Sequence, residues 1–371
     1  MIISGDRSHI DAKSSVGLRF ACPMEQCHRE IKSVTLHRTG AVGIHIDMRR
    51  REFIGLMGGA AVVWSVAAKA QGKLPVIGYL HFATPDYQPA ATSFLKGLAE
   101  TGLIEGKDFS ITYRWAEGHY DRLPAMASGL VELGVDLIAA FGPPPAKAAK
   151  LATSTIPIVF EVGNDAVEAG LVNSLARPGG NATGLNILFT QLTAKRLELL
   201  CQLLPRAKNI TLLINPKSPT AEPSIRDAQA GARAKGVQLS TLNASNDDEI
   251  EMAFSEFGKT GSDGLIVAAD PFFDTRREQL PAAAARHKVP TIYFEPEFST
   301  VGGLISYGSR LSLVYRHMGI YAGRILKGEK PADLPVEQPT KFELAINLKT
   351  AKALGIETPP ELLFTADEVI E

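Results

Sequence analysis

The sequence predicts an α/β protein in which two doubly wound lobes each contain a mainly parallel sheet with helices on both faces. From Leu74 onward, short runs rich in Val and Ile alternate with longer stretches of helical period. This rhythm begins again after a glycine-rich break at residues 177–184. Hydrophobic residues make up 45% of the 371 residues, which is enough apolar surface for packed cores. One sheet of ten strands is the alternative arrangement of the same elements.

In chain order, the expected strands are the runs at residues 75–80, 109–114, 135–140, 156–161, 209–214, 238–242, 264–268, 291–294, 304–307 and 342–346. The expected helices are the stretches at residues 87–102, 120–133, 145–152, 166–176, 190–204, 221–236, 247–259, 276–287, 311–327 and 349–354. Gly102 and Gly236 each end a helical stretch, as residues with positive φ at a helix C-terminus do. Asn246 precedes three acidic residues and is expected to cap the helix at 247–259.

The segment at residues 48–70 has the three parts of a secretory signal peptide. Three arginines follow Met48, an uncharged run covers residues 56–68, and small residues stand at −3 and −1 before Gln71. The pair Arg50-Arg51 further resembles a twin-arginine signal. A first buried helix is the alternative, but the charged start does not suit a core. We expect cleavage after Ala70 and export to the periplasm, with residues 1–47 as a disordered upstream extension from a start assigned too early.

Charge and cysteine content exclude several classes of partner. Lys and Arg number 39 and Asp and Glu number 40, and no basic block follows residue 70, so we expect no nucleic-acid and no membrane-surface partner. Two of the three Cys and half of the eight His lie within residues 1–47, without regular zinc spacing. Cys201 is the one Cys that would remain after cleavage, so no intrachain disulfide can form. We expect no metal and no cofactor.

Motifs that carry catalysis on α/β scaffolds are missing. The first expected strand is followed by His-Phe-Ala-Thr at residues 81–84 and by no Gly-x-Gly-x-x-Gly dinucleotide loop. The stretch 102–108 is one residue short of a phosphate loop and has Asp108 where Ser or Thr would hold magnesium. Neither Gly-x-Ser-x-Gly nor His-Glu-x-x-His occurs. The sequence therefore predicts a binding protein and no enzyme.

Open parallel sheets bind ligands beyond the carboxyl ends of their strands. The residues at these ends combine aromatic rings, carboxylates and small residues, which suits a small zwitterion held between two lobes. A carboxylate can pair with an ammonium, backbone N–H groups at helix starts can receive a carboxylate, and rings can cover an apolar part. The candidate ligand-binding residues are His81, Phe82, Thr84, Phe141, Gly142, Pro143, Gly163, Asn164, Asp165, Asn215, Ser218, Asp270, Phe272, Tyr293, Glu295 and Tyr307.

Several candidates would serve equally well in a structural role. Asp165 and Asp270 each stand before an expected turn or helix and could simply cap it. Phe141 and Phe272 could be ordinary core rings, and Gly142 could serve a turn alone. The joint placement of the candidates, more than any single residue, indicates a ligand site.

Longer stretches carry a resemblance to a known family. They lie at residues 49–60, 113–118, 121–124, 156–160, 177–184, 195–200, 215–216, 269–273 and 339–348, and include Tyr-Arg-Trp-Ala-Glu-Gly, Arg-Pro-Gly-Gly-Asn-Ala-Thr-Gly and Pro-Thr-Lys-Phe-Glu-Leu-Ala-Ile-Asn-Leu. By these stretches the chain resembles the ABC transporter substrate-binding family of the tryptophan and aromatic amino-acid uptake type, over residues 48–371. The family loop after the fourth strand usually reads Asp-Pro-Val, and here Ala166 follows Asp165. The resemblance therefore supports Asp165 as a ligand contact less firmly.

The resemblance implies a periplasmic binding protein fold of type I, with two Rossmann-like lobes joined by a three-strand hinge. We expect the crossings near residues 184–188, 304–308 and 339–346. Lobe 1 would then comprise residues 74–185 plus 304–335, and lobe 2 residues 188–300 plus 340–371. The implied function is a monomeric receptor that closes on a small solute, such as an amino acid, and docks on an ABC permease in the inner membrane.

Two other functions stay open at the level of sequence. A sensory or chemotaxis module would use the same lobes with a different partner, and adjacent permease and ATPase genes would argue against it. An exported α/β enzyme would lose turnover when Asp165 and Asp270 are substituted, whereas a receptor would lose only affinity.

Overall fold

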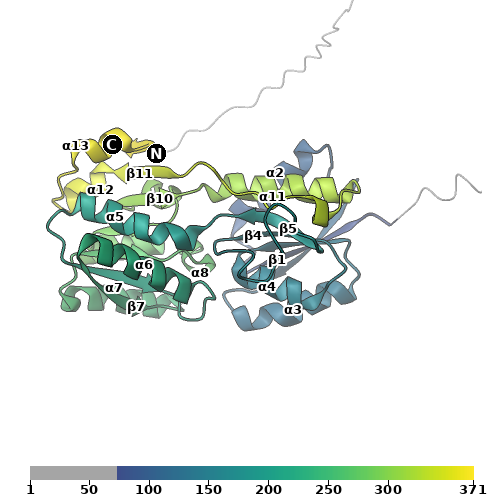
Figure 1. The fold of residues 1–371 in the computed structure, drawn as a ribbon, viewed down its shortest axis with the longest axis horizontal. Helices are drawn as coiled ribbons and strands as arrows, with labels where there is room; N and C mark the ends of the chain where they lie inside the picture. Colours follow the sequence, from purple (N-terminus) through teal and green to yellow (C-terminus); the bar gives the residue numbers. More distant parts are fainter. Residues whose placement is uncertain (1–72) are drawn as a thin grey trace, which may run out of the picture. The chain divides into compact units, whose positions relative to one another are not determined.

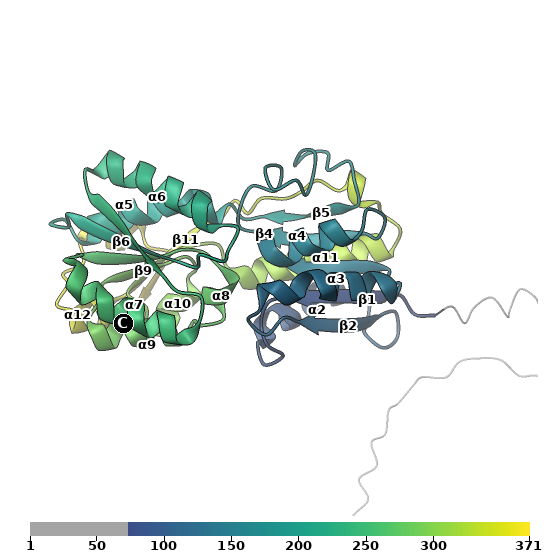
Figure 2. The ribbon, with the colours of Figure 1, turned by 90° about the horizontal axis from the view of Figure 1, so that it is seen from below.

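The computed structural model describes residues 73–371, in which helices and strands form two lobes, each on its own sheet (Figures 1 and 2). The expectation of two α/β lobes is confirmed, and the alternative of a single ten-stranded sheet is wrong. The expected signal peptide at 48–70 and the upstream extension at 1–47 lie outside the described residues.

The first lobe is a sheet of five parallel strands in the order β2-β1-β3-β4-β5. These strands are β1 Val76–His81, β2 Ser110–Trp115, β3 Leu137–Phe141, β4 Ile158–Val162 and β5 Ala182–Asn186. The helices are α2 Gln88–Glu100, α3 Leu123–Glu132, α4 Pro143–Ala152 and α11 Leu311–Leu326, with the short 3-10 turns η1 Tyr120–Arg122 and η3 Pro331–Asp333. Helices α2 and α11 pack together on one face, and α3 and α4 on the other (Figure 1).

Strand β3 shows how the sequence allows helices to cover both faces of this sheet. Leu137 and Phe141 pack into the core with α2 and α11, whereas Ile138 and Ala140 pack into the core with α3 and α4. Successive side chains of a strand point to opposite faces, so a strand between two layers of helices needs an uninterrupted apolar run.

Helices α2 and α11 approach closely because glycines stand at their contact. A Cβ atom on Gly97 would lie 1.8 Å from the carbonyl oxygen of Arg316, and one on Gly319 would lie 2.0 Å from that of Phe94. Only glycine leaves room for two backbones at this separation. Helix α11 thereby completes the first lobe, although it follows five strands of the second lobe in the sequence.

The second lobe is a sheet of seven strands in the order β12-β11-β10-β9-β8-β6-β7, in which β11 and β12 run opposite to the other five. These strands are β6 Asn209–Ile214, β7 Gln238–Asn243, β8 Gly264–Val267, β9 Thr291–Tyr293, β10 Ile305–Gly308, β11 Glu343–Asn347 and β12 Glu368–Ile370. The helices are α5 Thr193–Leu203, α6 Ala221–Lys235, α7 Asp247–Thr260, α8 Pro271–Asp274, α9 Gln279–His287, α10 Glu297–Thr300, α12 Leu348–Ala353 and α13 Pro360–Thr365, and the 3-10 turn η2 Phe189–Leu192 precedes α5. Helix α5 packs on α6, and α7 packs on α9.

The chain crosses between the lobes three times. It leaves the first sheet after β5 at residues 187–188, returns between β10 and α11 at residues 309–310, and crosses again at residues 338–342 before β11. We expected all of 304–335 in lobe 1, but β10 belongs to the second sheet and only the part from α11 onward packs on the first. A Cβ on Gly308 would lie 1.9 Å from the carbonyl oxygen of Phe294, so the end of β10 is pressed against the chain leaving β9.

Some elements differ from the expectation. Part of the glycine-rich break forms strand β5, where a Cβ on Gly184 would lie 1.9 Å from the carbonyl oxygen of Phe160 on β4. Strand β12 and the short helices α8, α10 and α13 were not predicted. Residues 166–176, predicted as a helix, form turns instead, and Gly170 with φ 70° ends the first of them.

The predicted helix ends are confirmed. Gly102 and Gly236 have φ values of 83° and 69°, as glycines that terminate helices do. The Asn246 side chain accepts a hydrogen bond from the backbone N–H of Glu249 at 2.9 Å and so caps α7.

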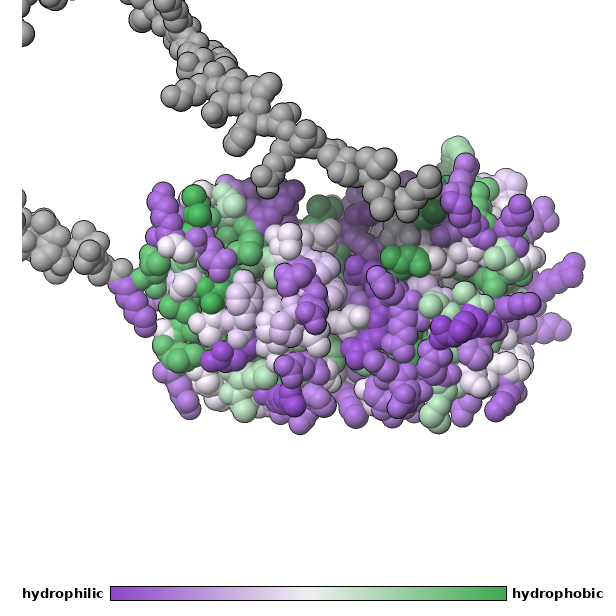
Figure 3. Space-filling model, turned by 180° about the vertical axis from the view of Figure 1, so that it is seen from behind, coloured by the Kyte–Doolittle hydropathy of each residue, from purple (hydrophilic) through white to green (hydrophobic). Residues whose placement is uncertain are grey.

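The face of the described part in Figure 3 is largely hydrophilic, with hydrophobic residues in small groups. No helix within residues 73–371 combines the length and the apolar character that a bilayer span needs.

Candidate functional site

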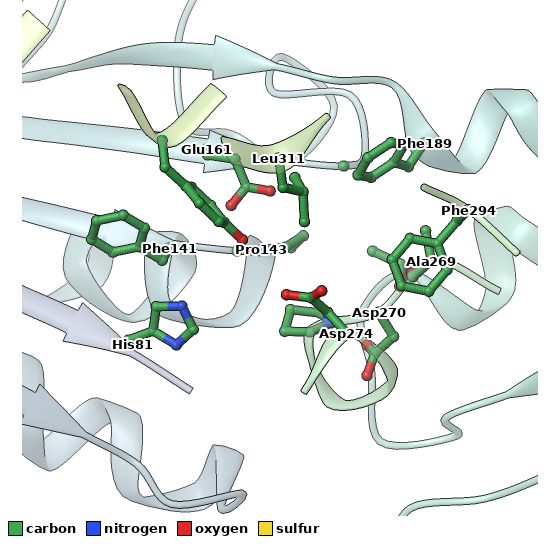
Figure 4. Close-up of a pocket in the computed structure, with 15 residues that line it drawn as sticks. His81, Phe141, Pro143, Glu161, Phe189, Ala269, Asp270, Asp274, Phe294 and Leu311 are labelled. Carbon is green, nitrogen blue, oxygen red and sulfur yellow. Dashed lines mark hydrogen bonds between the residues drawn. The ribbon is translucent and has the colours of Figure 1, made fainter. Parts of the chain in front are cut away.

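A pocket lies where the carboxyl ends of the two sheets face each other (Figure 4). It contains about 450 Å³ of space not filled by atoms, counted together with its opening to solvent. The first lobe contributes His81, Phe141, Gly142, Pro143, Glu161, Gly163, Leu311 and Tyr315, and the second contributes Phe189, Thr220, Ala269, Asp270, Pro271, Asp274 and Phe294. Both lobes therefore supply aromatic rings and carboxyl groups.

The first-lobe wall is built from the ends of neighbouring strands. His81 ends β1, Phe141 ends β3, and Glu161 is the next-to-last residue of β4. These ends lie side by side because β1, β3 and β4 are consecutive in the sheet. The ring of Phe141 lies 5.3 Å from that of His81 and 5.6 Å from that of Tyr315 on α11. The result is a continuous aromatic wall with one carboxyl group.

The second-lobe wall is fixed from behind by Arg196 of α5, which is fully buried. Its Nη1 donates to the carbonyl oxygen of Phe189 at 2.9 Å, and its Nε donates to that of Tyr307 at 2.8 Å. The rings of Phe189 and Phe294 meet edge to face at 5.9 Å. Arg196 thus holds the chain just after the first crossing against the end of β10.

Tyrosines of the first lobe reach across to aspartates of the second. The Tyr87 hydroxyl donates to Asp274 Oδ2 at 2.5 Å, and the Tyr120 hydroxyl donates to Asp270 Oδ1 at 2.9 Å. A Cβ atom on Gly142 would lie 2.8 Å from Cγ of Pro271. The two lobes are therefore in contact at the pocket.

Asp270 is held firmly by one of its two carboxyl oxygens. Besides Tyr120, its Oδ1 accepts hydrogen bonds from Asn215 Nδ2 and from the backbone N–H of Phe272, both at 3.0 Å. Its Oδ2 is buried and has no partner in the described part of the protein. Burial raises the pKa of Asp270, although its hydrogen bonds oppose this.

Asp274 belongs to a buried charge cluster with Arg277 and Glu295. Nη2 of Arg277 donates to Asp274 Oδ1 at 2.5 Å and to Glu295 Oε1 at 2.6 Å. Burial works to raise the pKa of Asp274, but the charge of Arg277 and hydrogen bonds to the carboxylate lower it overall. Burial and the nearby Asp274 raise the pKa of Glu295. Asp274 is therefore the carboxylate that stays ionised.

Glu161 and His81 have pKa values shifted mainly by burial. Burial, with a further contribution from Asp274, raises the pKa of Glu161 to about 8. Burial lowers the pKa of His81 to about 4, so its imidazole is neutral at pH 7. His81 Nδ1 accepts the backbone N–H of Ala83 at 2.9 Å, which places the proton on Nε2, and this buried Nε2 has no partner within residues 73–371.

The structure brings some predicted site residues together in the pocket and places others behind it. Those that line it are His81, Phe141, Gly142, Pro143, Gly163 and Asp270. Asn215 and Glu295 support it through Asp270 and Arg277. The hydroxyl group of Ser218 lies 2.8 Å from that of the lining residue Thr220.

The remaining predicted residues lie away from the pocket. The Asp165 carboxylate accepts backbone N–H groups of the following turn, and the Asn164 carbonyl accepts a hydrogen bond from Asn186. The other five pack elsewhere: Phe82 on Tyr120, Thr84 in an outer groove, Phe272 under the guanidinium of Arg276, Tyr293 on Phe298, and Tyr307 with its carbonyl on Arg196.

Two carboxyl residues of the pocket, Glu161 and Asp274, are not among the residues predicted from the sequence. Glu161 is the last residue of the strand predicted at 156–161, and a carboxyl group in an otherwise apolar strand was an available signal. Asp274 follows Asp270 by four residues, a spacing that brings side chains together on a helix. Tyr87 and Tyr120 gave no such signal, because their partners lie 187 and 150 residues away.

Within residues 73–371, no three His, Cys, Asp or Glu side chains gather in a way that could hold a metal ion. Glu161, Asp270 and Asp274 face the pocket from different elements, and Asp274 is already bound by Arg277.

Comparisons with known proteins agree with this geometry. A family model for "ABC transporter substrate binding protein" matches residues 83–370. A tyrosine-binding protein of Clostridioides difficile is 30% identical over 278 residues, which are 74% of this chain and 78% of that protein. The structure of an ABC domain in complex with L-Trp from Streptococcus pneumoniae covers 80% of this chain and 100% of its own, with TM-score 0.72 and 26% identity. A ligand-free, open substrate binding protein with adhesive properties from Clostridium difficile covers 80% and 99%, with TM-score 0.56 and 27% identity.

Proposed function

The chain belongs to the family of ABC transporter substrate-binding proteins, and on this premise we propose that it is the receptor of an importer that traps a small solute between its lobes. The family consists of binding proteins and not of enzymes. The proposed solute is an amino acid or a similar amine with an aromatic part. The receptor would meet this solute in the periplasm and deliver it to an ABC permease in the inner membrane.

The pocket is the observation that carries this proposal. Its rings, from Phe141 and Tyr315 on one side and Phe189 and Phe294 on the other, suit a flat apolar body. The carboxyl groups of Glu161 and Asp274 suit a positively charged amine. The relatives named for tyrosine and for L-Trp bind solutes of this kind. We propose that the solute contacts His81, Phe141, Glu161, Phe189, Asp270, Asp274, Phe294 and Tyr315.

Capture would work by closure of the lobes. The hydrogen bonds from Tyr87 to Asp274 and from Tyr120 to Asp270 join the lobes, so they exist only when the lobes are together. A solute that contacts both walls stabilises the same form. The higher TM-score with the L-Trp complex than with the open, ligand-free relative, at nearly equal identity, supports a closed form here. Since both walls come from one chain, a monomer suffices.

Titration calorimetry and thermal unfolding of the purified protein test the proposal, with aromatic amino acids and aromatic amines as ligands. The ring of Trp115 lies 5.4 Å from that of His81, so its fluorescence should change when the pocket fills. We expect saturable binding of at least one compound and recovery of that compound unchanged. Absence of any heat, fluorescence change or rise in Tm across the set would contradict the proposal, as would chemical conversion of the bound compound.

A further inference from the structure

The pocket is lined by acidic side chains and by no strongly basic ones. Glu161 from the first lobe and Asp274 from the second both point to its centre in Figure 4, and Asp270 adds a third carboxyl group at its edge. None of the lining residues, all within 73–371, is Lys or Arg. A ligand that enters as a zwitterion would bring a carboxylate into a site lined by three carboxyl groups, of which Asp274 is ionised and paired with Arg277, and by no Lys or Arg.

The cation that touches a lining carboxylate is already engaged. Nη2 of Arg277 is shared by Asp274 and Glu295, and the Arg277 side chain lines a separate outer groove together with Thr84 and Arg276. The Arg277 guanidinium is therefore already paired with two buried carboxyl groups of the protein. The Arg277 side chain does not line the pocket itself, so it does not directly contact a carboxylate held there.

Helix α4, one of the helices that begin at the pocket, lacks donors for a carboxylate. Helix α4 begins with Pro143, Pro144 and Pro145, none of which has a backbone N–H. The N–H of Gly142 donates to the carbonyl oxygen of Glu161 at 3.1 Å, and that of Ala146 donates to the carbonyl oxygen of Gly142 at 3.0 Å. We expected helix starts to receive the carboxylate of a ligand, and at α4 this expectation is wrong because every position from 142 to 146 is without a free N–H.

Two polar atoms of the lining residues lack a partner in the described part of the protein, Asp270 Oδ2 and His81 Nε2, and His81 Nε2 is the one that can donate to a ligand. His81 is 2% exposed, and its Nε2 carries a proton and donates to no described group. Because the imidazole is neutral, it suits an uncharged acceptor such as a hydroxyl or carbonyl oxygen better than it balances a full negative charge.

We propose that the solute is a primary arylalkylamine without a carboxylate, whose ammonium lies between Glu161 and Asp274 and whose hydroxyl or carbonyl oxygen, where it has one, accepts from His81. This deepens the proposed function and rests on it. The rival position for a carboxylate is the start of α11, where Leu311 lines the pocket. Binding of matched amines and amino acids distinguishes a solute without a carboxylate from one whose carboxylate lies at the start of α11.

Matched pairs of ligands test the inference by titration calorimetry on the purified protein at pH 7. Tyramine is compared with L-tyrosine, phenethylamine with L-phenylalanine, and tryptamine with L-tryptophan, with 3-(4-hydroxyphenyl)propionate as the acid that lacks the amine. We expect at least one amine to bind tenfold or more tightly than its amino acid, and no binding of the acid. Tighter binding of the amino acids would overturn the inference and leave the proposed function intact. No binding by any member would overturn both.

The isosteric variant Glu161→Gln tests the position of the ammonium. Glu161 is mostly protonated at pH 7 in the solute-free protein, and an ammonium bound beside it would lower its pKa so that it ionises. Gln cannot ionise, so we expect the Kd of the best amine to rise tenfold or more. The control Glu168→Gln, on an exposed residue of the same lobe, should leave the Kd unchanged. An unchanged Kd for a folded Glu161→Gln protein would contradict the assigned position. If that variant fails to fold, the ligand pairs on the unmodified protein still decide the inference.

Discussion

At the residue scale, tyrosine–aspartate pairs link the two lobes. Asp270 accepts three hydrogen bonds on one oxygen, and the one from Tyr120 is the one that comes from the opposite lobe. A hydrogen bond made only in the closed form shifts the equilibrium toward closure by its own free energy. Under the proposed closure, such residues would contribute to affinity without needing to touch the solute.

Tyr120→Phe should weaken solute binding about 5- to 30-fold, since about 1–2 kcal/mol of hydrogen bonding to a charged group is lost from the closed form. Calorimetric Kd values measure the effect. Tyr113→Phe is the control, because Tyr113 lies on β2 and makes no contact with Asp270. Equal Kd values for Tyr120→Phe and the unmodified protein would show that this pair plays no part in closure.

Glu161 makes stability depend on pH. Its pKa of about 8 in the folded protein lies above the ordinary value of 4.5, because burial and then Asp274 disfavour the charged form. The groups that face it are Asp274 of α8, His81 of β1 and Tyr315 of α11. The folded protein thus holds a proton that the unfolded chain releases. This contribution is fully present below about pH 4.5 and is lost as the pH rises through about 8.

We therefore expect the free energy of unfolding in Glu161→Gln to fall less between pH 5 and pH 8.5 than in the unmodified protein. Urea denaturation at both pH values measures the difference. Glu168→Gln should follow the unmodified protein. Parallel pH curves for Glu161→Gln and the unmodified protein would show that Glu161 is already ionised at neutral pH.

At the element scale, the local sequence pattern predicted strands β1–β4 and β6–β11. Each of them is present in the structure, with small differences at its ends. Strand β5 was missed because its residues, Ala182 to Asn186, include glycine and lack a run of Val and Ile. Its place is set by backbone contact with β4, which no local pattern carries. The helix predicted at 166–176 failed because the Asp165 side chain and Gly170 close a turn instead.

The glycine contact between α2 and α11 can be tested directly. Gly97→Ala would place a methyl group against the backbone of Arg316, so we expect a loss of about 3 kcal/mol of stability. Gly129→Ala in α3 is the matched control, since a Cβ there meets no atom within 4 Å. It should stabilise the protein by about 0.5–1 kcal/mol, because glycine is a poor helix former. Urea unfolding compares them, and similar stabilities for the two variants would mean that the helices can move apart.

At the scale of the whole molecule, the pocket exists only because two lobes meet. Phe141 and Asp270 could be predicted, because each stands at a strand end within its own lobe. The pairing of Tyr87 with Asp274 could not, because it depends on the angle at which the lobes close. Sequence therefore predicts the residues at the edge of each sheet better than the partners that they find across the cleft.

A disulfide across the cleft should lock the closed form. A Cβ on Gly142 would lie 3.7 Å from Cβ of Pro271, within the spacing of about 3.5–4.5 Å that disulfides need. In the chain from Gln71 onward with Cys201→Ser, we expect the oxidised Gly142→Cys/Pro271→Cys protein to retain solute bound before oxidation. The reduced double variant is the control, because it carries the same backbone strain. Equally fast release from both forms, measured with labelled solute, would contradict gating by lobe closure.

Helix α11 gives the protein an unusual order of assembly. The sheet that it covers is complete at residue 186, yet the helix itself ends at Leu326. On the ribosome, the apolar face of that sheet beside α2 stays bare until almost the entire polypeptide has emerged. The N-terminal lobe cannot mature as it is synthesised. It reaches its native packing only after translation is nearly finished, and until then that apolar face is exposed to aggregation.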